Sequence, residues 1–129
     1  MEEKVQANEV LYRGIKRSQP DSMKQGRPTS ALFKQEDGVS VDRDGGRPED
    51  VIIHDFGRRF QKRFKGLVKV GAQVCFDHNM AVIPETEHNL YHAEIFENED
   101  KLPLSSLNAL ILADNSEVVI YDQNIEWTR

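Results

Sequence analysis

Hydrophobic and polar residues alternate with a period of two in two short segments, which is the pattern of a strand with one buried face. In the segment V-S-V-D, Val39 and Val41 fall on one face, and Ser40 and Asp42 fall on the other. Residues 90–96 alternate in the same way. Further apolar runs predict strands at residues 10–15, 67–70 and 118–121, and two short strands within residues 72–83 around a turn at 77–79.

A spacing of four predicts a helix after the turn signal of residues 44–48. The apolar residues at this spacing are Ile52, Phe56, Phe60 and Phe64. Pro48 suits the first turn of a helix, and Gly66 suits a position just beyond its end. A second helix is predicted over residues 103–114, with Ser105 or Ser106 as its N-cap.

Strands and helices are mixed here without regular alternation, which favours an α+β fold. We therefore expect a mainly antiparallel sheet with one or two packed helices. The length of 129 residues fits one domain, residues 1–129, whose polar residues 1–8 are expected to be flexible.

The charge and cysteine content indicate a cytoplasmic protein with no membrane association. The formal net charge is −5, which argues against bulk, non-specific binding of nucleic acid. Cys75 is the only cysteine, so no disulfide can form within the chain. The charged N-terminus does not match a signal peptide, and no apolar run approaches the ~20 residues that span a bilayer.

A basic run lies on the predicted helix and is expected on the face opposite its phenylalanines. It consists of Arg58, Arg59, Lys62, Arg63 and Lys65. This patch could bind a polyanion or an acidic protein partner. The alternative is an ordinary solvated face, because every amphipathic helix has a charged side.

No metal site and no cofactor are expected from the remaining chemistry. The four histidines, His54, His78, His88 and His92, lack the paired spacing of zinc ligands. A calcium loop starting at Asp42 fails because its twelfth position is Ile53 rather than glutamate. Cys75 lies in the apolar context V-C-F, which is typical of a buried thiol.

One set of residues resembles the Arg–Ser–Glu order of arginine-specific mono-ADP-ribosyltransferases. The set is Arg13 in L-Y-R-G, Ser30 in T-S, and Glu94 or Glu97. The resemblance implies NAD as the cofactor and Arg13, Ser30 and Glu97 as catalytic candidates. In that family the arginine grips the pyrophosphate, the serine shapes the nicotinamide pocket and the glutamate stabilises the ribosyl cation. The paired-glutamate motif departs from the pattern, since only the segment 97–99 gives E-x-E.

A second resemblance spans residues 11–95 and is to an uncharacterised family of small bacterial proteins. The shared features are an Arg-Pro-Ser/Thr-Ser turn, a Ser-Val-Asp strand and an Asn-x-x-His-Ala segment. These features occur here as R-P-T-S, S-V-D and N-L-Y-H-A. The resemblance points to Arg13 and Ser30, and to these binding candidates: Arg27, Ser40, Asp42, Asn89 and His92. It supplies no reaction.

The sequence therefore leaves two functions open. The first is a small binding or interaction protein with a polar pocket formed by Arg13, Arg27, Ser30, Asp42 and His92. The second is a nucleotide-dependent enzyme of the ADP-ribosyltransferase type. In either case Asp42 and His92 are hypothesised to be neighbours in one cleft. The alternative is that Asp42 only caps the turn at residues 44–46 while His92 faces solvent.

Overall fold

The computed structural model describes residues 3–128, and its main element is a six-stranded antiparallel sheet in the order β6-β7-β4-β1-β5-β8. Its strands are β1 (Val10–Lys16), β4 (Val39–Arg43), β5 (Phe64–Gly71), β6 (Ala81–Pro84), β7 (His92–Phe96) and β8 (Glu117–Tyr121). A separate hairpin pairs β2 (Met23–Lys24) with β3 (Arg27–Pro28). The α-helices are α1 (Glu49–Phe60), α2 (Ala72–Asp77) and α3 (Ser106–Asp114), and the 3-10 helices are η1 (Pro20–Ser22), η2 (Ser30–Phe33) and η3 (Gln61–Arg63).

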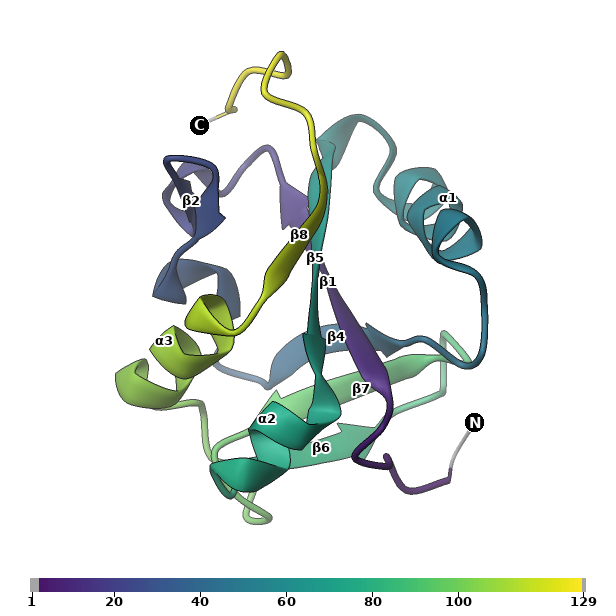
Figure 1. Ribbon diagram of the computed structural model, residues 1–129, viewed down its shortest axis with the longest axis vertical. Helices are drawn as coiled ribbons and strands as arrows, with labels where there is room; N and C mark the ends of the chain where they lie inside the picture. The colour runs from purple at the N-terminus through teal and green to yellow at the C-terminus, as the bar shows by residue number, and fades with distance from the viewer. Residues whose placement is uncertain (1–2, 129) are drawn as a thin grey trace.

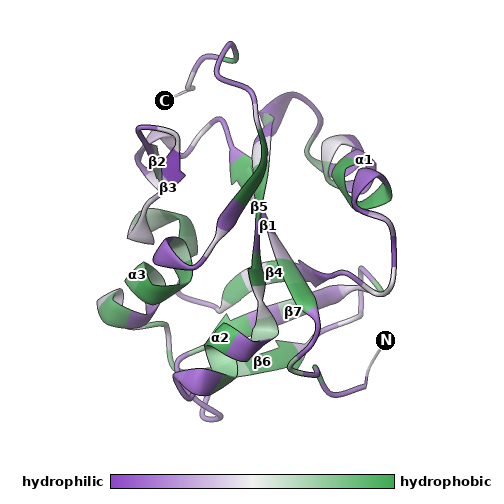
Figure 2. Ribbon diagram, viewed as in Figure 1, coloured by the Kyte–Doolittle hydropathy of each residue, from purple (hydrophilic) through white to green (hydrophobic). Residues whose placement is uncertain are grey.

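The helices lie on both sides of the sheet, with α1 on one side and α2 and α3 on the other (Figure 1). Two separate clusters of buried side chains fill the two layers. The smaller cluster joins Ile52 and Phe56 of α1 to Tyr12 and Leu67 of the sheet. The larger cluster includes residues of η2, α2 and α3 on the opposite side. Hydrophobic and hydrophilic residues both occur along the central strands (Figure 2). The antiparallel sheet with helices on both sides confirms the expected α+β fold with a mainly antiparallel sheet.

The sheet divides between β1 and β4, and this division positions the candidate site. The strand β1 pairs with β5 along its whole length, but with β4 only at Leu11–Arg43 and Tyr12–Asp42. The Arg13 side chain bridges the strands beyond that point, and its guanidinium donates to Ser40 O and Leu32 O, each at 2.9 Å. Arg13 therefore replaces backbone hydrogen bonds where the two strands separate.

The helix α1 ends earlier than the spacing predicts, and the reason is strand pairing. Gln61 has a positive φ of 51°, a conformation that breaks a helix. Phe64, which was expected on the helix, instead begins β5 opposite Lys16. The pairing of β5 with β1 thus overrides the four-residue periodicity at its last position.

The segment from Ala72 to Asp77 is a helix, so the prediction of two strands within residues 72–83 is wrong in its first half. Ala72 and Cys75 are both buried, and their spacing of three places them on one helical face. The β-branched and aromatic residues Val74 and Phe76 are only partly buried. Burial of the helical face therefore outweighs their strand propensity. The second predicted strand is present as β6.

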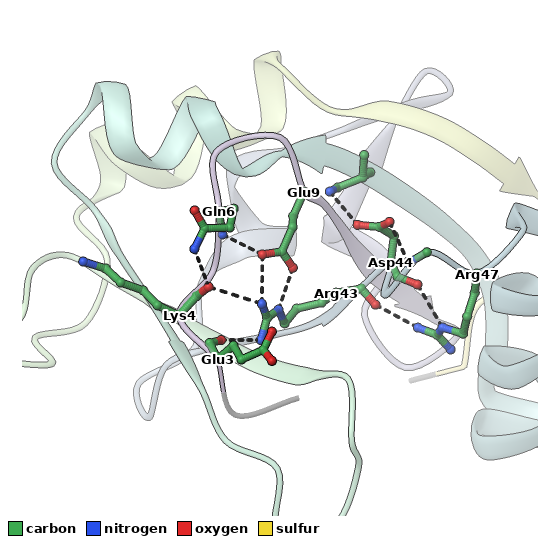
Figure 3. Close-up of polar contacts among 9 residues, drawn as sticks. Glu3, Lys4, Gln6, Glu9, Arg43, Asp44 and Arg47 are labelled. Atoms are coloured by element: carbon green, nitrogen blue, oxygen red, sulfur yellow. Dashed lines mark hydrogen bonds and ion pairs between the residues drawn. The ribbon is translucent and has the colours of Figure 1, made fainter.

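The segment that precedes β1 contacts the sheet at Val5, at Glu9 and through the Glu3 carbonyl. Val5 is buried, and the Arg43 guanidinium donates to Glu9 at 2.6 and 2.8 Å and to Glu3 O at 2.7 Å. Figure 3 shows this cluster, in which Arg43 joins the segment to the sheet. The expected flexibility of residues 1–8 stays a prediction, and among residues 3–8 only Val5 is buried. Residues 1–2 lie outside the described part of the chain.

The C-terminal segment after β8 is held by a second buried cation. The ammonium of Lys65 donates to the carbonyls of Asp122 and Ile125, and it lies 4.3 Å from the centre of the Trp127 ring. Lys65 is 2% exposed. It was expected on the solvated helix face, but its position in β5 turns it inward.

Candidate functional site

A pocket of about 210 Å³ opens beside the division between β1 and β4, on the side of the sheet covered by α1. We call it the Arg59 pocket. Its lining residues are Arg13, Gly14, Lys16, Gln35, Ser40, Val41, Asp42, Phe56, Arg59, Phe60 and His92. Strand alternation explains why several of them meet, because Asp42 lies opposite both Tyr12 and His92 on its neighbouring strands.

Asp42 is the buried carboxylate of the pocket, and its neighbours come from α1, from β7 and from the loops that precede these two elements. Its Oδ2 accepts a hydrogen bond from Arg59 Nη2 at 2.6 Å, and its Oδ1 accepts one from Asn89 Nδ2 at 3.1 Å. Arg47 Nη2 lies 3.9 Å away, and His92 is also close enough to favour the ionised form. Burial raises the pKa of Asp42 despite these opposing contacts. The main chemical role of Asp42 in the pocket is to orient Arg59.

Lys16 and Arg59 bring unsatisfied donors to the pocket. Within residues 3–128, the Arg59 side chain makes one hydrogen bond, to Asp42, and the Lys16 side chain has no hydrogen-bond or ion-pair partner. Burial, followed by the nearby charges of Arg13 and Arg63, lowers the pKa of Lys16. The lysine therefore lies in a setting that favours an added negative charge.

Two phenylalanines of α1 form the apolar wall of the pocket. The rings of Phe56 and Phe60 meet edge to face at 5.5 Å between centroids. Arg59 lies 4.5 Å from the centroid of Phe56, and Lys16 lies 5.2 Å from that of Phe60. A Cβ at Gly14 would lie 2.3 Å from Phe60 Cε2, so only glycine allows this approach of ring and strand.

Ser40 of β4 and His92 of β7 continue the polar side of the pocket. Glu94 is not a lining residue, but it lies opposite Ser40 on the neighbouring strand, and its carboxylate lies 4.0 Å from His92 Nε2. Arg13 donates to the backbone oxygen of Ser40 at 2.9 Å. Burial lowers the pKa of Arg13 to about 10, which still leaves it charged at neutral pH.

The structure brings some of the candidate residues together and leaves others apart. Ser40, Asp42 and His92 line the pocket, and Asn89 contacts Asp42. Arg27 lies elsewhere, where it donates to Ser116 O at 3.3 Å. Ser30 begins η2 and is not among the lining residues.

Glu97 also lies apart from the pocket, because it is engaged at the start of α3. It accepts hydrogen bonds from Ser105 N at 2.9 Å and from Asn108 Nδ2 at 2.8 Å. The backbone hydrogen bond from Ser105 is the main cause of its lowered pKa. Ser105 is the N-cap of α3, as one of the two alternatives predicted.

The basic run is divided among different environments, and the expectation that it lies on the helix opposite the phenylalanines is wrong for Arg59 and Arg63, as it is for the buried Lys65. Arg59 and Arg63 lie over phenylalanine rings, with Arg63 5.8 Å from the centroid of Phe60. Arg58 is 66% exposed and contacts Asp55 at 3.8 Å. Lys62 is exposed in η3.

Sequence reasoning missed Lys16 as a pocket residue and gave Arg59 only a surface role. Lys16 could have been found from the alternation along β1, because a period of two places Tyr12, Gly14 and Lys16 on the same face of the strand. The signal for Arg59 was weaker, since only the fold brings it to Asp42.

The other reactive side chains form no further site. Among residues 3–128, no group of three histidine, cysteine, aspartate or glutamate side chains is arranged to hold a metal ion. Cys75 is buried in α2, and burial raises the pKa of its thiol to about 12. None of the helices described has the length and apolar character needed to cross a membrane.

Comparisons with known proteins found no relative of this chain. No protein-family model matches the chain. No curated protein and no solved structure matches it either. The function must therefore be argued from the pocket itself.

Proposed function

We propose that this protein binds a small anionic ligand of the nucleotide class in the Arg59 pocket. The observation that carries the proposal is the pair of cationic side chains, Lys16 and Arg59, whose donors meet no acceptor beyond Asp42 in residues 3–128. Charged donors of this kind bind phosphate or carboxylate oxygens with about 1.5–3 kcal/mol per hydrogen bond. A phosphate group would supply the missing acceptors.

The aromatic wall supports a nucleotide over a bare anion. Phe56 and Phe60 offer ring edges and faces beside the cations, and Val41 adds apolar surface. A ligand with both a flat ring and a phosphate matches this mixture. The volume of about 210 Å³ is below the roughly 300–1,000 Å³ usual for whole ligands. The pocket therefore suits one part of such a ligand, with the rest extending over the surface.

Titration calorimetry with ADP, adenosine and inorganic phosphate tests this proposal. We expect ADP to bind more tightly than either fragment. Lys16→Ala should weaken ADP binding by about tenfold or more, as expected for one lost charge-assisted contact. Lys24→Ala is the matched control, because Lys24 is exposed on the β2–β3 hairpin. Undetectable ADP and phosphate binding by the wild type, or equal loss in both variants, would refute the proposal.

A second candidate is ADP-ribosyl transfer from NAD, and one arrangement favours it. Arg13 donates to the backbone oxygen of Ser40, and Ser40 is the strand partner of Glu94, so the three follow the Arg–Ser–Glu order of the resemblance with Ser40 in place of Ser30. In this scheme Arg13 is a positioning residue, because its guanidinium is occupied by Leu32 O and Ser40 O.

The chemical role would fall to Glu94. In the transfer, the bond between ribose and nicotinamide breaks, nicotinamide leaves with the electron pair, and an acceptor nucleophile bonds to the ribosyl carbon while losing its proton. A carboxylate beside that carbon stabilises the developing positive charge. Release of nicotinamide from NAD by the wild type, abolished in Glu94→Gln with NAD binding retained, is the expected result. Binding of NAD without any release on prolonged incubation would leave the protein a binding protein only.

A cytoplasmic location in a bacterium belongs to the same proposal. It is supported by the single cysteine, which is free and buried, and by the resemblance to small bacterial proteins.

A further inference from the structure

Six cationic side chains gather around the mouth of the Arg59 pocket and the end of α1. They are Lys16, Arg17, Arg58, Arg59, Lys62 and Arg63. In the described part of the chain, two carboxylates form ion pairs with them, Asp55 with Arg58 and Asp42 with Arg59. The whole protein has a formal charge of −5, so this end differs in sign from the molecule as a whole.

Phe60 lies at the centre of this basic rim. Lys16 Nζ, the Arg59 guanidinium and the Arg63 guanidinium lie 5.2, 6.0 and 5.8 Å from the centroid of its ring. An aromatic ring surrounded by cations matches the alternation of bases and phosphates in a nucleic acid strand. An acidic peptide offers the charges but not the regular flat rings.

Backbone hydrogen bonds hold the outer part of the rim in place. Arg17 N donates to Arg63 O at 2.8 Å, and Thr128 N donates to Arg17 O at 2.8 Å. The Arg17 guanidinium donates to Lys62 O at 3.0 Å and to Glu126 O at 3.2 Å. The end of β1, η3 and the C-terminal segment are therefore tied together, so little backbone ordering is required when a ligand binds.

We propose that the nucleotide in the Arg59 pocket is one unit of a single-stranded nucleic acid, whose neighbouring phosphates contact Arg63, Lys62 and Arg17. This inference rests on the proposed function, since it names the larger molecule to which the pocket's ligand belongs. A single strand fits better than a duplex because a volume of about 210 Å³ admits part of one nucleotide and no base pair.

Fluorescence anisotropy with eight-residue oligonucleotides of DNA and of RNA tests the inference, with ADP as the mononucleotide. We expect the wild type to bind one or both oligonucleotides at least about tenfold more tightly than ADP. The logarithm of the affinity should fall with the logarithm of the salt concentration, by about 0.7 for each phosphate neutralised. If Arg17, Lys62 and Arg63 each neutralise one phosphate, they contribute roughly −2 to the slope of log affinity against log salt concentration, in addition to the contribution of the pocket.

Two variants separate the rim from the pocket. Lys62→Glu should weaken oligonucleotide binding by about tenfold while ADP binding stays within about twofold, because Lys62 is exposed in η3 and does not line the pocket. Lys16→Ala should weaken both. Lys24→Glu is the charge-reversal control, and thermal melting establishes that each variant is folded.

The outcomes distinguish this inference from the proposed function. If ADP binds but neither oligonucleotide binds more tightly, the inference is overturned and the proposed function stands. If neither ADP nor an oligonucleotide binds, both fail. If polyglutamate binds the rim more tightly than either oligonucleotide does, the partner is an acidic protein and the nucleic-acid inference is wrong.

Discussion

Cationic side chains occupy two contrasting settings in this molecule. Arg13, Arg43 and Lys65 are at most 9% exposed, and carbonyl or carboxylate oxygens accept their hydrogen bonds. Lys16 and Arg59 lie partly exposed in the pocket and keep donors without acceptors among residues 3–128. The first group joins segments of the fold, and the second is available to a ligand.

The difference shows how burial separates structural from functional charge. A charge that leaves water must be fully satisfied, because an unpaired buried ion is strongly destabilising. The donors of a partly exposed charge are hydrated by water, so they remain available to the acceptor atoms of a ligand. Exposure and hydrogen-bond partners therefore distinguish residues that the sequence alone presents as equivalent arginines and lysines.

The largest effect is expected from Arg43→Met, which should lower the free energy of unfolding by about 3–5 kcal/mol. The substitution leaves the Glu9 carboxylate and the Glu3 carbonyl without their main donor. Urea unfolding measures the change. The matched control is Arg58→Met at a 66% exposed position, where a change within about 0.5 kcal/mol is expected. Similar values for the two variants would remove the distinction between the settings.

Arg13→Met should have the next largest effect, about 2–3 kcal/mol, because Leu32 O and Ser40 O lose their donor where β1 and β4 separate. Hydrogen exchange should also show faster opening of β4 than of β5. A loss below about 0.5 kcal/mol would mean that water replaces the guanidinium without penalty.

A smaller effect is expected on acidification, through Glu9. Burial acts to raise its pKa, but the Arg43 side chain and the Gln6 backbone outweigh this and lower the pKa below its usual value of 4.5. The folded state therefore binds fewer protons than the unfolded state. The stabilisation is present above about pH 4.5 and is lost as the pH falls through the lower folded-state pKa. Glu9→Gln should remove this part of the pH dependence, and an identical acid profile in both proteins would contradict the assignment.

Lys16→Ala should have the smallest effect on stability, within about 0.5 kcal/mol, since its ammonium has no hydrogen-bond or ion-pair partner in residues 3–128 and only a long contact with the Phe60 ring. Its removal should even relieve repulsion with Arg13 and Arg63. Thermal melting measures this. A loss of more than about 2 kcal/mol would place Lys16 among the structural cations.

The sequence pattern correctly predicted elements that have one buried face and one exposed face, or a clear capping residue. The alternation of residues 39–42 and the cap at Ser105 are both present in the structure. The segment 72–77 was misassigned, because its strand-forming residues are overridden by packing of Ala72 and Cys75. Such an outcome depends on contacts distant in sequence, which periodicity does not contain.

The part of the candidate site that depends on neighbouring strands could be predicted from the sequence, and the part that depends on the placement of α1 could not. Asp42 and His92 are opposite each other on β4 and β7, as alternation on neighbouring strands suggested. The contact between Arg59 and Asp42 depends on how α1 crosses the sheet, and no local pattern encodes that crossing. Arg13 could not be recognised as a structural residue, because its role depends on the division between β1 and β4.

The most direct test of the central claim is an NMR titration of the ¹⁵N-labelled protein with ADP. The claim is that the unsatisfied cations of the Arg59 pocket bind a nucleotide. We expect the amide signals of Gly14, Lys16 and Ser40 to shift with one common dissociation constant, and those of Gly26 and Asn115, which do not line the pocket, to stay unchanged. Shifts that are absent, or that concentrate away from the pocket, would contradict the account.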